Sequence, residues 1–531
     1  MIEREFNLLD EPWIVVLRKD GSTDKLSLTG ALARAADFRC LAGELPTQDA
    51  AIMRLLLAVL HTVVSRYAPD GTEAPIASAS QALKRWKAIW DAGAFPMEIV
   101  QAYLNRWHDR FWLFDAERPF FQVPHIGKAT EYTAAKLNGE LNESENKIRL
   151  FSQRCGQEKN TLEIDEAVRW LVCLNAYDDC ATKPTPKLGW MGMLGLIFAN
   201  GENLFKTLML NLILLKDGNE LWESEKPAWE QKDVKYDVCT MIPMPDNLSE
   251  LYTLQSRRIL FKRNGEKVES YLVLGGDFFQ KDNAFAEQMT VWRNAAKNDK
   301  VEPLYHPRRH DPSRQIWRDF GSLVAQKQGG HRPGVVSWIA RLKREGILKE
   351  KLVKFATVSV MYQGVFKSSI DDVFSDTLSF SAEILTEKGE RWIPLVLAEI
   401  ETSDKFVSQL AYLAQRIAKA AGDSDGLFER NAAKEMAYYR LDMPFREWLE
   451  GIDAENDEQA QVAERWWNTA QPIIRSVGKE LIAAAGPQAL TGRTLIENKK
   501  EIRYCAPEAY NYFLYCTASR EALATGGKKN G

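Results

Sequence analysis

The last third of the sequence carries the pattern that most limits the possible folds. Between residues 392 and 520, apolar side chains recur at helical spacing with few helix-breaking residues between them. Leu410, Leu413 and Ile417 stand at i, i+3 and i+7, which places them on one face of a helix. The pattern predicts helices over residues 391–421, 426–450, 457–485 and 503–520. Because consecutive helices with short connections pack into up-down bundles, we predict a C-terminal four-helix bundle over residues 386–531.

Residues 1–385 lack this regularity and mix the patterns of strands, helices and loops. Loose alternation over Phe6–Leu17, followed by Asp20-Gly21, predicts an N-terminal β-hairpin, and Asn264-Gly265 within Tyr252–Leu274 predicts another. The polar, aperiodic stretch Asn138–Asn160 predicts a long surface loop. Helices are expected over residues 46–64, 79–90, 96–107 and 162–176. We therefore predict an α+β fold, with a large mixed globular domain over residues 1–385 ahead of the bundle.

Composition narrows the classes of protein that fit. The formal net charge is −4, without the basic excess of many free-standing DNA-binding proteins, so a nucleic-acid contact must use a local basic surface or charge supplied by partners. The seven cysteines include no C-x-x-C pair and are odd in number, which argues against a zinc ribbon or a disulfide framework and favours reduced thiols in the cytoplasm. The sequence predicts neither a secretory signal nor a membrane span.

Motifs of several catalytic classes are absent from the sequence. It contains no G-x-x-x-x-G-K-[ST] phosphate loop and no H-E-x-x-H zinc helix. His306 and His310 have the i, i+4 spacing of metal ligands on a helix. The intervening Pro307 and two adjacent arginines instead favour a basic surface loop.

Adjacent carboxylates offer a second candidate for chemistry. Asp178-Asp179 and Asp371-Asp372 are such pairs, but neighbouring side chains do not converge on one point in a helix or a strand, so both pairs are predicted to be solvated. Cys155 has no positioned base nearby in the sequence and is expected to be inert. We therefore expect no enzymatic activity, no metal and no cofactor.

Two short runs and their order along the chain indicate a family. The opening run Phe6–Ile14, FNLLDEPWI, contains an N-L-x-x-x-x-W-I core, and Arg118–Gln122 reads RPFFQ. A polar loop, a glycine-bearing loop, a sheet-rich middle and a helical C-terminus follow. This order resembles the CasA family, the large subunits of type I-E CRISPR Cascade surveillance complexes, over nearly the whole chain.

The resemblance implies a function in antiviral defence. A CasA protein docks onto crRNA and the other Cascade subunits, reads the protospacer-adjacent motif (PAM) of target double-stranded DNA from the minor groove, promotes strand separation and R-loop formation, and recruits a helicase-nuclease. Guide pairing reads most of the target, so protein needs to read only the PAM. Because the minor-groove code is degenerate, such a reader should tolerate several PAMs.

The resemblance also places candidate sites on this sequence. The family's crRNA- and subunit-docking loop corresponds to Arg149, Leu150, Phe151, Ser152, Gln153 and Arg154. The loop that approaches the PAM corresponds to Lys183, Lys187 and Gly189, although Thr182–Pro186 stands where the family often has a run of glycines. The strand-separating wedge corresponds to Gln363, Gly364, Phe366 and Lys367. Further DNA contacts are expected at Lys281, Arg308 and Arg309.

Alternatives stay open at each site and for the whole chain. The docking loop could be a plain surface loop, Gly189, Gly192 and Gly195 could serve helix packing, and the wedge could be a simple turn. The chain could belong to another CRISPR effector subtype. It could be a hydrolase in which His306, His310 and carboxylates converge only in three dimensions, or a protein scaffold that never touches nucleic acid.

Overall fold

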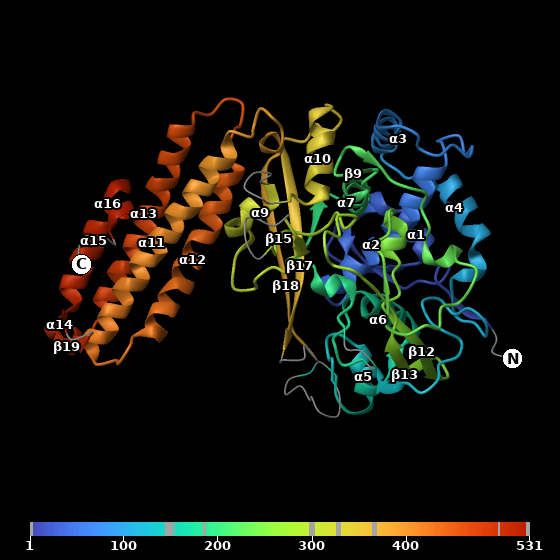
Figure 1. The fold of residues 1–531 in the computed structure, drawn as a ribbon, viewed down its shortest axis with the longest axis horizontal. Coiled ribbons are helices and arrows are strands. Elements are labelled where there is room, and N and C mark those ends of the chain that lie inside the picture. Colours follow the sequence, from blue (N-terminus) through green and yellow to red (C-terminus); the bar gives the residue numbers. More distant parts are fainter. Residues whose placement is uncertain are drawn as a thin grey trace. The chain divides into compact units, whose positions relative to one another are not determined.

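The structure, a computed structural model, describes residues 4–143, 152, 154–182, 184, 187–296, 303–324, 331–363, 369–497 and 500–526. The chain forms two compact units: unit 1 comprises Met1–Ile316, Ser322–Lys349 and Lys354–Thr377, and unit 2 comprises Trp317–Gly321, Glu350–Val353 and Leu378–Gly531. Unit 1 mixes helices with small sheets and unit 2 is mainly helical, so the predicted α+β fold class is confirmed (Figure 1). The division between residues 385 and 386 stays a prediction, because unit 2 also takes in two short earlier segments.

The helices of unit 1 vary widely in length. They are α1 (Leu28–Ala33), α2 (Pro46–Arg66), α3 (Ala79–Ala92), α4 (Met97–Arg106), α5 (Ala134–Leu137), α6 (Ile164–Tyr177), α7 (Leu204–Asn211), α8 (Leu248–Tyr252) and α10 (Gly334–Arg344). Helix α9 (Phe320–Val324) includes residues of both units. The four helices predicted in this part of the chain correspond to α2, α3, α4 and α6 and are confirmed.

Helix α2 forms the centre of unit 1. Apart from Asp49, its residues from Thr47 to Val64 are all buried. Among the described helices, α2 alone is long and apolar enough to cross a membrane, but 94% of its most apolar window is buried inside the protein, as in a core helix. Burial lowers the pKa of His61 to about 3, so this core side chain stays neutral.

The strands that lie wholly or partly in unit 1 form several small sheets. They are β1 (Glu5–Asn7), β2 (Ile14–Arg18), β3 (Thr23–Leu26), β4 (Phe38–Leu41), β5 (Trp112–Phe114), β6 (Thr130–Thr133), β7 (Leu162–Glu163), β8 (Leu196–Asn200), β9 (Leu215–Lys216), β10 (Glu220–Leu221), β11 (Thr240–Ile242), β12 (Arg257–Asn264), β13 (Lys267–Gly275), β14 (Asp277–Phe279), β15 (Trp292–Asn294), β16 (Tyr305–Pro307), β17 (Leu352–Gln363) and β18 (Ser369–Ser381). The larger sheets have the strand orders β3-β2-β4, β12-β13-β6 and β18-β17-β8.

Both predicted hairpins are present. Strands β2 and β3 pair antiparallel around Gly21, and β12 and β13 pair antiparallel around Gly265. Both glycines have positive φ, 89° and 60°, a backbone conformation that glycine adopts readily. The strand expected over Phe6–Leu17 is only partly right, because β1 pairs with β5 and only β2 enters the hairpin.

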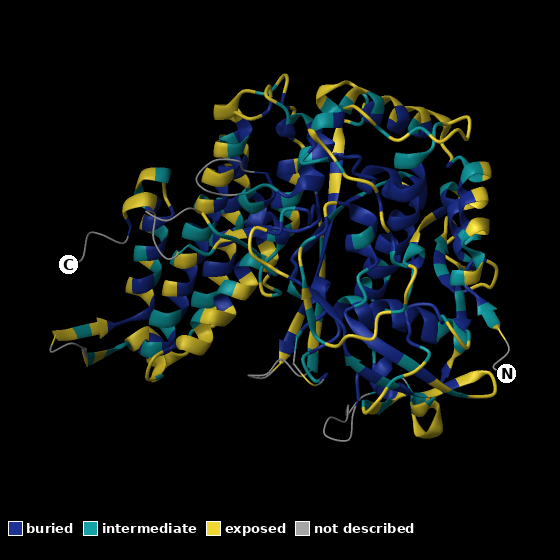
Figure 2. Ribbon diagram, turned by 45° about the vertical axis from the view of Figure 1, so that its right-hand side comes forward, coloured by how far each residue is buried: buried dark blue, intermediate teal, exposed yellow. Residues whose placement is uncertain are grey.

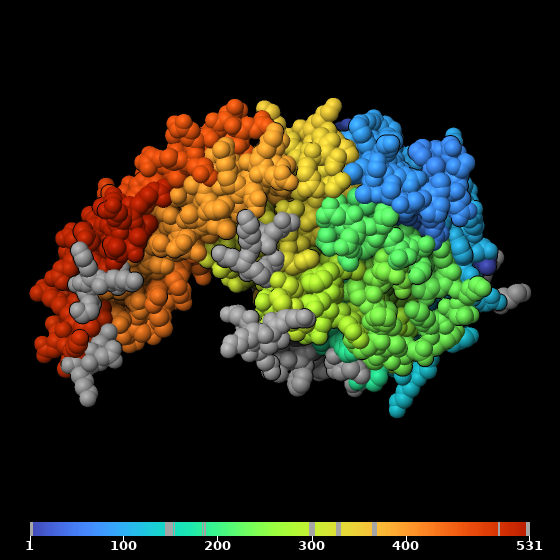
Figure 3. Space-filling model, turned by 45° about the horizontal axis from the view of Figure 1, so that its top comes forward, coloured from blue at the N-terminus to red at the C-terminus, as the bar shows by residue number. Residues whose placement is uncertain are grey.

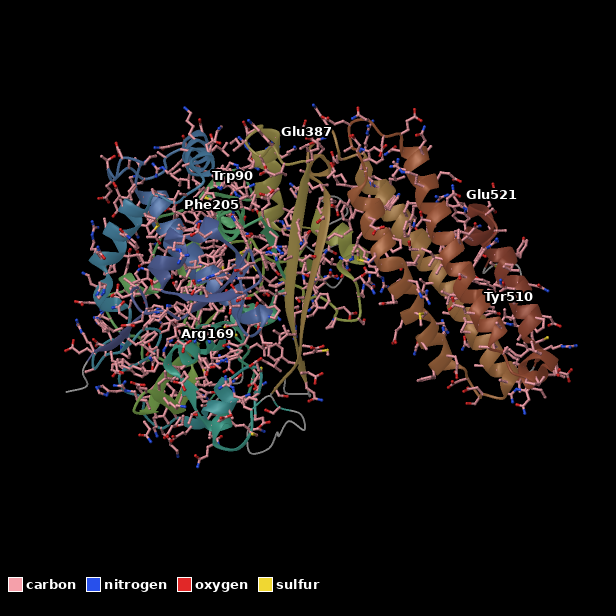
Figure 4. The ribbon with its side chains drawn as sticks, turned by 180° about the vertical axis from the view of Figure 1, so that it is seen from behind. Trp90, Arg169, Phe205, Glu387, Tyr510 and Glu521 are labelled. Carbon is pink, nitrogen blue, oxygen red and sulfur yellow. The ribbon has the colours of Figure 1, made fainter. Side chains whose placement is uncertain are left out.

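The opening run that indicated the family forms a turn in which residues 7–9, 13 and 14 are buried and residues 10–12 are exposed. The Asn7 side chain accepts a hydrogen bond from the Leu9 amide at 3.0 Å, and the Trp13 indole donates to the Leu8 carbonyl at 3.0 Å. The carbonyl of Trp13 accepts from Arg169 of α6 at 2.8 Å. Arg169 lies in the interior of unit 1 (Figure 4), so the run is fixed to a central helix.

Unit 2 contains the predicted helical region. Its elements are α11 (Trp392–Ala421), α12 (Leu427–Glu450), α13 (Gln459–Ala483), α14 (Pro487–Thr491), β19 (Arg493–Glu497), β20 (Lys500–Tyr504), α15 (Ala506–Cys516) and α16 (Arg520–Thr525). Buried and exposed residues alternate along the long helices, as amphipathic helices require (Figure 2). The buried side chains include Trp392, Leu410, Phe445, Trp466 and Phe513. The first three predicted helices of this region are confirmed.

The fourth predicted helix, over residues 503–520, is wrong at both ends. Helix α15 begins only at Ala506, because Lys500–Tyr504 pairs with Arg493–Glu497 as a hairpin. It ends at Cys516, and the Ser519 side chain then caps a separate helix by accepting from the Ala522 amide. The β-hairpin and the capping serine therefore both interrupt the helical pattern of apolar residues that we expected to continue over residues 503–520.

The surface loop predicted over residues 138–160 is wrong at its beginning. Asn138, Leu141 and Asn142 are at most 3% exposed. The Asn142 side chain accepts a hydrogen bond from the Lys136 ammonium at 2.7 Å, which draws the segment into unit 1. Residues 144–151 and 153 lie outside the described residues, and Gly156–Asn160 forms a short 3₁₀ helix without buried residues.

Candidate nucleic-acid interface

Half of the predicted site residues can be located in the structure. Lys187, Gly189, Lys281, Arg308, Arg309, Gln363, Ser152 and Arg154 are described, and all belong to unit 1. The other predicted contacts lie outside the described residues; they are Lys183, Gly364, Phe366, Lys367, Arg149, Leu150, Phe151 and Gln153.

The prediction that Asp178-Asp179 is solvated is wrong. The two residues follow the last turn of α6 and are 7% and 1% exposed. Asp178 pairs with Arg257 and accepts from the Thr182 hydroxyl at 2.8 Å, while Asp179 pairs with Lys136. Burial and the neighbouring Asp178 charge raise the pKa of Asp179, and Lys136 opposes this. Each carboxylate has a cation beside it because an unpaired buried charge is very costly.

Arg257, the first residue of β12, holds both ends of the segment 180–186. Its side chain is fully buried. One terminal nitrogen, Nη2, donates to the Asp179 carbonyl at 2.8 Å and to the Lys187 carbonyl at 2.7 Å. The Nε atom donates to the Asp178 carboxylate. One planar guanidinium therefore fixes the start and the end of the segment that we predicted as the PAM-approaching loop.

The glycines after this segment are required by packing. A Cβ atom built on any of them would overlap a neighbour: at 2.4 Å from the Ala176 carbonyl oxygen for Gly189, at 2.1 Å from the Tyr362 hydroxyl for Gly192, and at 2.2 Å from the Arg308 carbonyl oxygen for Gly195. Close packing therefore accounts for all three glycines, but the helix packing that we expected applies only to Gly189, which meets α6. Because Gly189 is buried, we do not carry it forward as a DNA contact. Lys187 is partly exposed, with its ammonium 5.1 Å from the centre of the Phe278 ring.

The hairpin of β17 and β18 is anchored next to these glycines. Tyr362 is buried near the end of β17, and its hydroxyl donates to the carbonyl of Tyr177, the last residue of α6, at 2.5 Å. Burial and the nearby Asp178 charge raise the pKa of Tyr362, so the hydroxyl keeps its proton. The Arg309 guanidinium lies 5.5 Å from the ring centre, and the next residue, Gln363, is exposed.

Lys281 and Arg308 differ in how freely they could reach DNA. Lys281 is exposed after β14, and within the described residues its side chain makes no hydrogen bond or ion pair. The middle of the chain, green to yellow-green by the bar, covers a broad area of the face of unit 1 that Figure 3 shows. Arg308 is partly buried and donates to the Ser322 hydroxyl at 3.1 Å. Lys281 is therefore the better placed of the two for a groove contact.

The described part of the predicted docking loop is held against α6. Arg154 forms a two-pronged ion pair with Glu166, with nitrogen–oxygen distances of 2.7 and 3.2 Å. The Ser152 hydroxyl donates to the Arg154 carbonyl at 2.8 Å. A phosphate contact by Arg154 would have to replace the Glu166 carboxylate.

The two candidate metal-binding histidines contact different partners. His306 Nε2 lies 2.7 Å from an Asp282 carboxylate oxygen, and His310 Nε2 lies 3.3 Å from the Leu196 carbonyl oxygen. His310 is only 5% exposed, so the surface-loop interpretation is wrong for this residue. Among the described residues, no group of three or more His, Cys, Asp or Glu side chains is placed to hold a metal ion. Asp371-Asp372 is exposed, as predicted.

Sequence reasoning missed Arg257 and Tyr362, which organise this region. Nothing in the local sequence around Arg257 distinguishes it from a surface arginine of a hairpin. Tyr362 had a weak signal, because Val358, Val360 and Tyr362 alternate along β17 and all three are buried. This two-residue strand pattern predicts that the tyrosine ring is buried, but it does not predict which residue the ring or its hydroxyl contacts.

Comparison with known proteins assigns the family. The family model of CRISPR-associated protein Cse1 matches residues 7–477. The chain belongs to the Cse1 family of CRISPR-associated proteins. The resemblance to CasA, the other name of this family's proteins, is therefore confirmed.

Comparison with individual proteins extends the match to nearly the whole of this chain. The chain is 26% identical to the CRISPR-associated protein CasA/Cse1 of Thermus thermophilus, over 94% of this chain and 99% of that protein. The crystal structure of Thermobifida fusca Cse1 superposes with a TM-score of 0.83 at 30% identity, over 98% of both chains. A chain of a CRISPR RNA-guided surveillance complex shares the fold, with a TM-score of 0.71 at 15% identity over 97% of this chain and 100% of that one.

Proposed function

We propose that this Cse1-family chain is the large subunit of a type I-E CRISPR Cascade complex. In this role it reads the PAM of target double-stranded DNA through the minor groove, promotes strand separation and R-loop formation, and recruits the helicase-nuclease. Its partners are crRNA, the other Cascade subunits and target DNA, and it acts in the cytoplasm without catalysis, metal or cofactor. Family membership and the likeness to a surveillance-complex chain support the proposal.

One observation about the site carries the DNA-binding part of the proposal. The end of the PAM-approaching segment at Lys187, the end of β17 at Gln363 and the guanidinium of Arg309 are all tied to the buried residues Tyr362 and Asp178. A loop that reads a groove and a hairpin that enters between strands need such a common support, because their separation must match the geometry of the duplex.

The residues take distinct roles in this proposal. Lys281, Lys183 and Lys187 contact the PAM, and Arg308 and Arg309 contact phosphates, which adds to the salt dependence of binding. The hairpin end at Gln363, Gly364, Phe366 and Lys367 replaces the stacking that the opened base pair loses. The segment Arg149–Arg154 docks onto crRNA and the adjoining subunit.

The test is a gel-shift assay of the assembled complex. Complexes with and without this chain are mixed with duplexes that differ only in the PAM. We expect tight binding only with the chain and the PAM together. The variant K281A should bind the PAM duplex about tenfold more weakly, since one good groove contact is worth roughly 1–3 kcal/mol. The control K128A removes an exposed lysine of unit 1 without an assigned role and should bind like the wild type. Equal binding of both duplexes, with or without the chain, would contradict the proposal.

A further inference from the structure

We infer that the Tyr362 hydroxyl is a latch that couples PAM reading to strand opening. It joins the β17–β18 hairpin to the same turn of α6 that carries the PAM-approaching segment. The inference rests on the proposed function and adds a positioning residue that contacts no DNA itself.

The first step is the carbonyl that receives the hydroxyl. The last carbonyls of an α-helix have no partner within the helix and must find one elsewhere. Tyr177 is the last residue of α6, and Tyr362 supplies the donor for its carbonyl. Tyr177 and Tyr362 are 1% and 8% exposed, so water has little access to take over this role. Because a buried carbonyl without a partner is unfavourable, the hairpin and the helix end are held together.

The second step connects this turn to the PAM-approaching segment. Asp178 and Asp179 follow Tyr177 directly, and Arg257 binds both of them together with the Lys187 carbonyl. A shift of the segment at Lys187 therefore acts on Arg257, then on the end of α6, and then on Tyr362. Every link in this path is a buried or partly buried hydrogen bond, an ion pair or a covalent bond between neighbours.

The third step is the fit of the hydroxyl. Gly192 leaves the space in which the Tyr362 hydroxyl sits, since a Cβ at this position would lie 2.1 Å from that oxygen. Further from the hairpin end, Ser359 donates to the Leu194 carbonyl at 3.4 Å, and Val358 pairs with Leu196 of β8. Tyr362 is thus the buried anchor nearest to the exposed Gln363, the last described residue of β17.

The test compares Y362F with Y177F in the assembled complex. Y362F removes the hydrogen bond and keeps the ring. Y177F is a matched control, because Tyr177 is buried beside it and its own hydroxyl has no partner among the described residues. Duplex binding with and without the PAM is measured by gel shift, and opening next to the PAM by 2-aminopurine fluorescence. We expect Y362F to keep PAM discrimination within about twofold but to open DNA about fivefold more slowly, the effect of losing one hydrogen bond. Y177F should match the wild type.

The outcomes separate the inference from the proposed function. Wild-type complex that binds both duplexes equally would overturn the proposed function. Wild-type PAM dependence together with normal opening by Y362F would overturn the latch alone.

A second pair of variants tests the latch independently. G192A places a methyl group where the hydroxyl sits, and should slow opening in the wild-type background. In the Y362F background the nearest ring atom would be 3.0 Å away, still a close contact, so G192A should add less than it does in the wild-type background. Independent, multiplying effects of the two substitutions would overturn the latch.

Discussion

The two units bury charge in different ways. In unit 1 several ion pairs have both side chains almost fully buried, including Arg54–Glu287, Arg257–Asp178, Arg258–Asp277 and Lys136–Asp179. In unit 2 the acid with the lowest exposure among the described residues, Glu399, pairs with Arg520, whose side chain is 39% exposed. Unit 2 relies instead on apolar and aromatic packing, as between Phe445 and Trp466.

This difference separates two tasks that one chain must perform. An apolar core accepts many combinations of side chains of similar volume and mainly provides stability. A buried ion pair adds little net stability, but it fixes one geometry, because either partner left alone is strongly destabilising. Two of these pairs, Arg257–Asp178 and Lys136–Asp179, lie at the start of the segment that we assign to PAM reading, where geometry matters most.

The largest effect is expected from removing a buried cation of unit 1. R257M leaves Asp178 buried without its partner and frees the carbonyls at both ends of the segment 180–186. The free energy of unfolding of unit 1 should fall by about 4 kcal/mol. Hydrogen exchange of the amides in α6 and β12, followed by mass spectrometry, measures this loss locally, without assuming that the whole chain unfolds in one step.

The matched change in unit 2 is R520M, which removes the partner of Glu399. Because the Arg520 side chain is partly exposed, we expect a smaller loss of about 1 kcal/mol, seen in α11. A loss for R257M no larger than that for R520M would contradict the proposed contrast between the units.

A core substitution in unit 2 should have the next largest effect. Leu410 of α11 is fully buried, and L410A should lower the free energy of unfolding of unit 2 by about 3 kcal/mol through lost burial and a cavity. The same change at Leu427 of α12, which is 47% exposed, is the control and should cost less than about 1 kcal/mol. Faster exchange in α11–α13 with α2 unchanged is expected; equal acceleration in α2 would show that the two cores do not act independently.

The same contrast explains which features could be predicted from the sequence. The helices α11, α12 and α13 follow from contacts between residues three, four and seven apart, so a local period is enough to find them. The turn at Asn264-Gly265 is equally local. The fourth helix failed because the hairpin of β19 and β20 interrupts the period over a few residues, and two shorter helices follow it.

The candidate site depends on contacts that no local pattern contains. Arg257 and Asp178 are 79 residues apart, and Tyr362 and Tyr177 are 185 apart. The rule that adjacent carboxylates diverge is sound for Asp178-Asp179, but it says nothing of cations that approach from other helices or strands. Lys281 could be proposed only through the family resemblance, and its role stays a prediction.

The most selective prediction concerns pH. Glu225 is 2% exposed; one carboxylate oxygen accepts from the Ser249 amide at 2.6 Å, and the other has no partner among the described residues. Burial raises the pKa of Glu225 from 4.5 to about 7. The folded protein therefore binds more protons than the unfolded chain between these pH values. The free energy of unfolding of unit 1 should fall as the pH rises from about 4.5 to about 7 and change little above that.

The variant E225Q isolates the contribution of this one side chain. Glutamine keeps an acceptor for the Ser249 amide but carries no charge, so E225Q should be more stable than the wild type by about 2 kcal/mol at about pH 8 and nearly equal at about pH 4. The control E223Q changes an exposed carboxylate two residues away and should leave the profile unaltered. Burial also raises the pKa of Asp49 in α2 to about 7, so E225Q should flatten only part of the slope in unit 1. The measurement is hydrogen exchange of α8 between about pH 5 and 8, corrected for the intrinsic exchange rate. If the free energy of unfolding of the wild type does not decline over this range, Glu225 is solvated or has a partner in solution. The contrast between unit 1 and unit 2 would then rest on the paired charges alone.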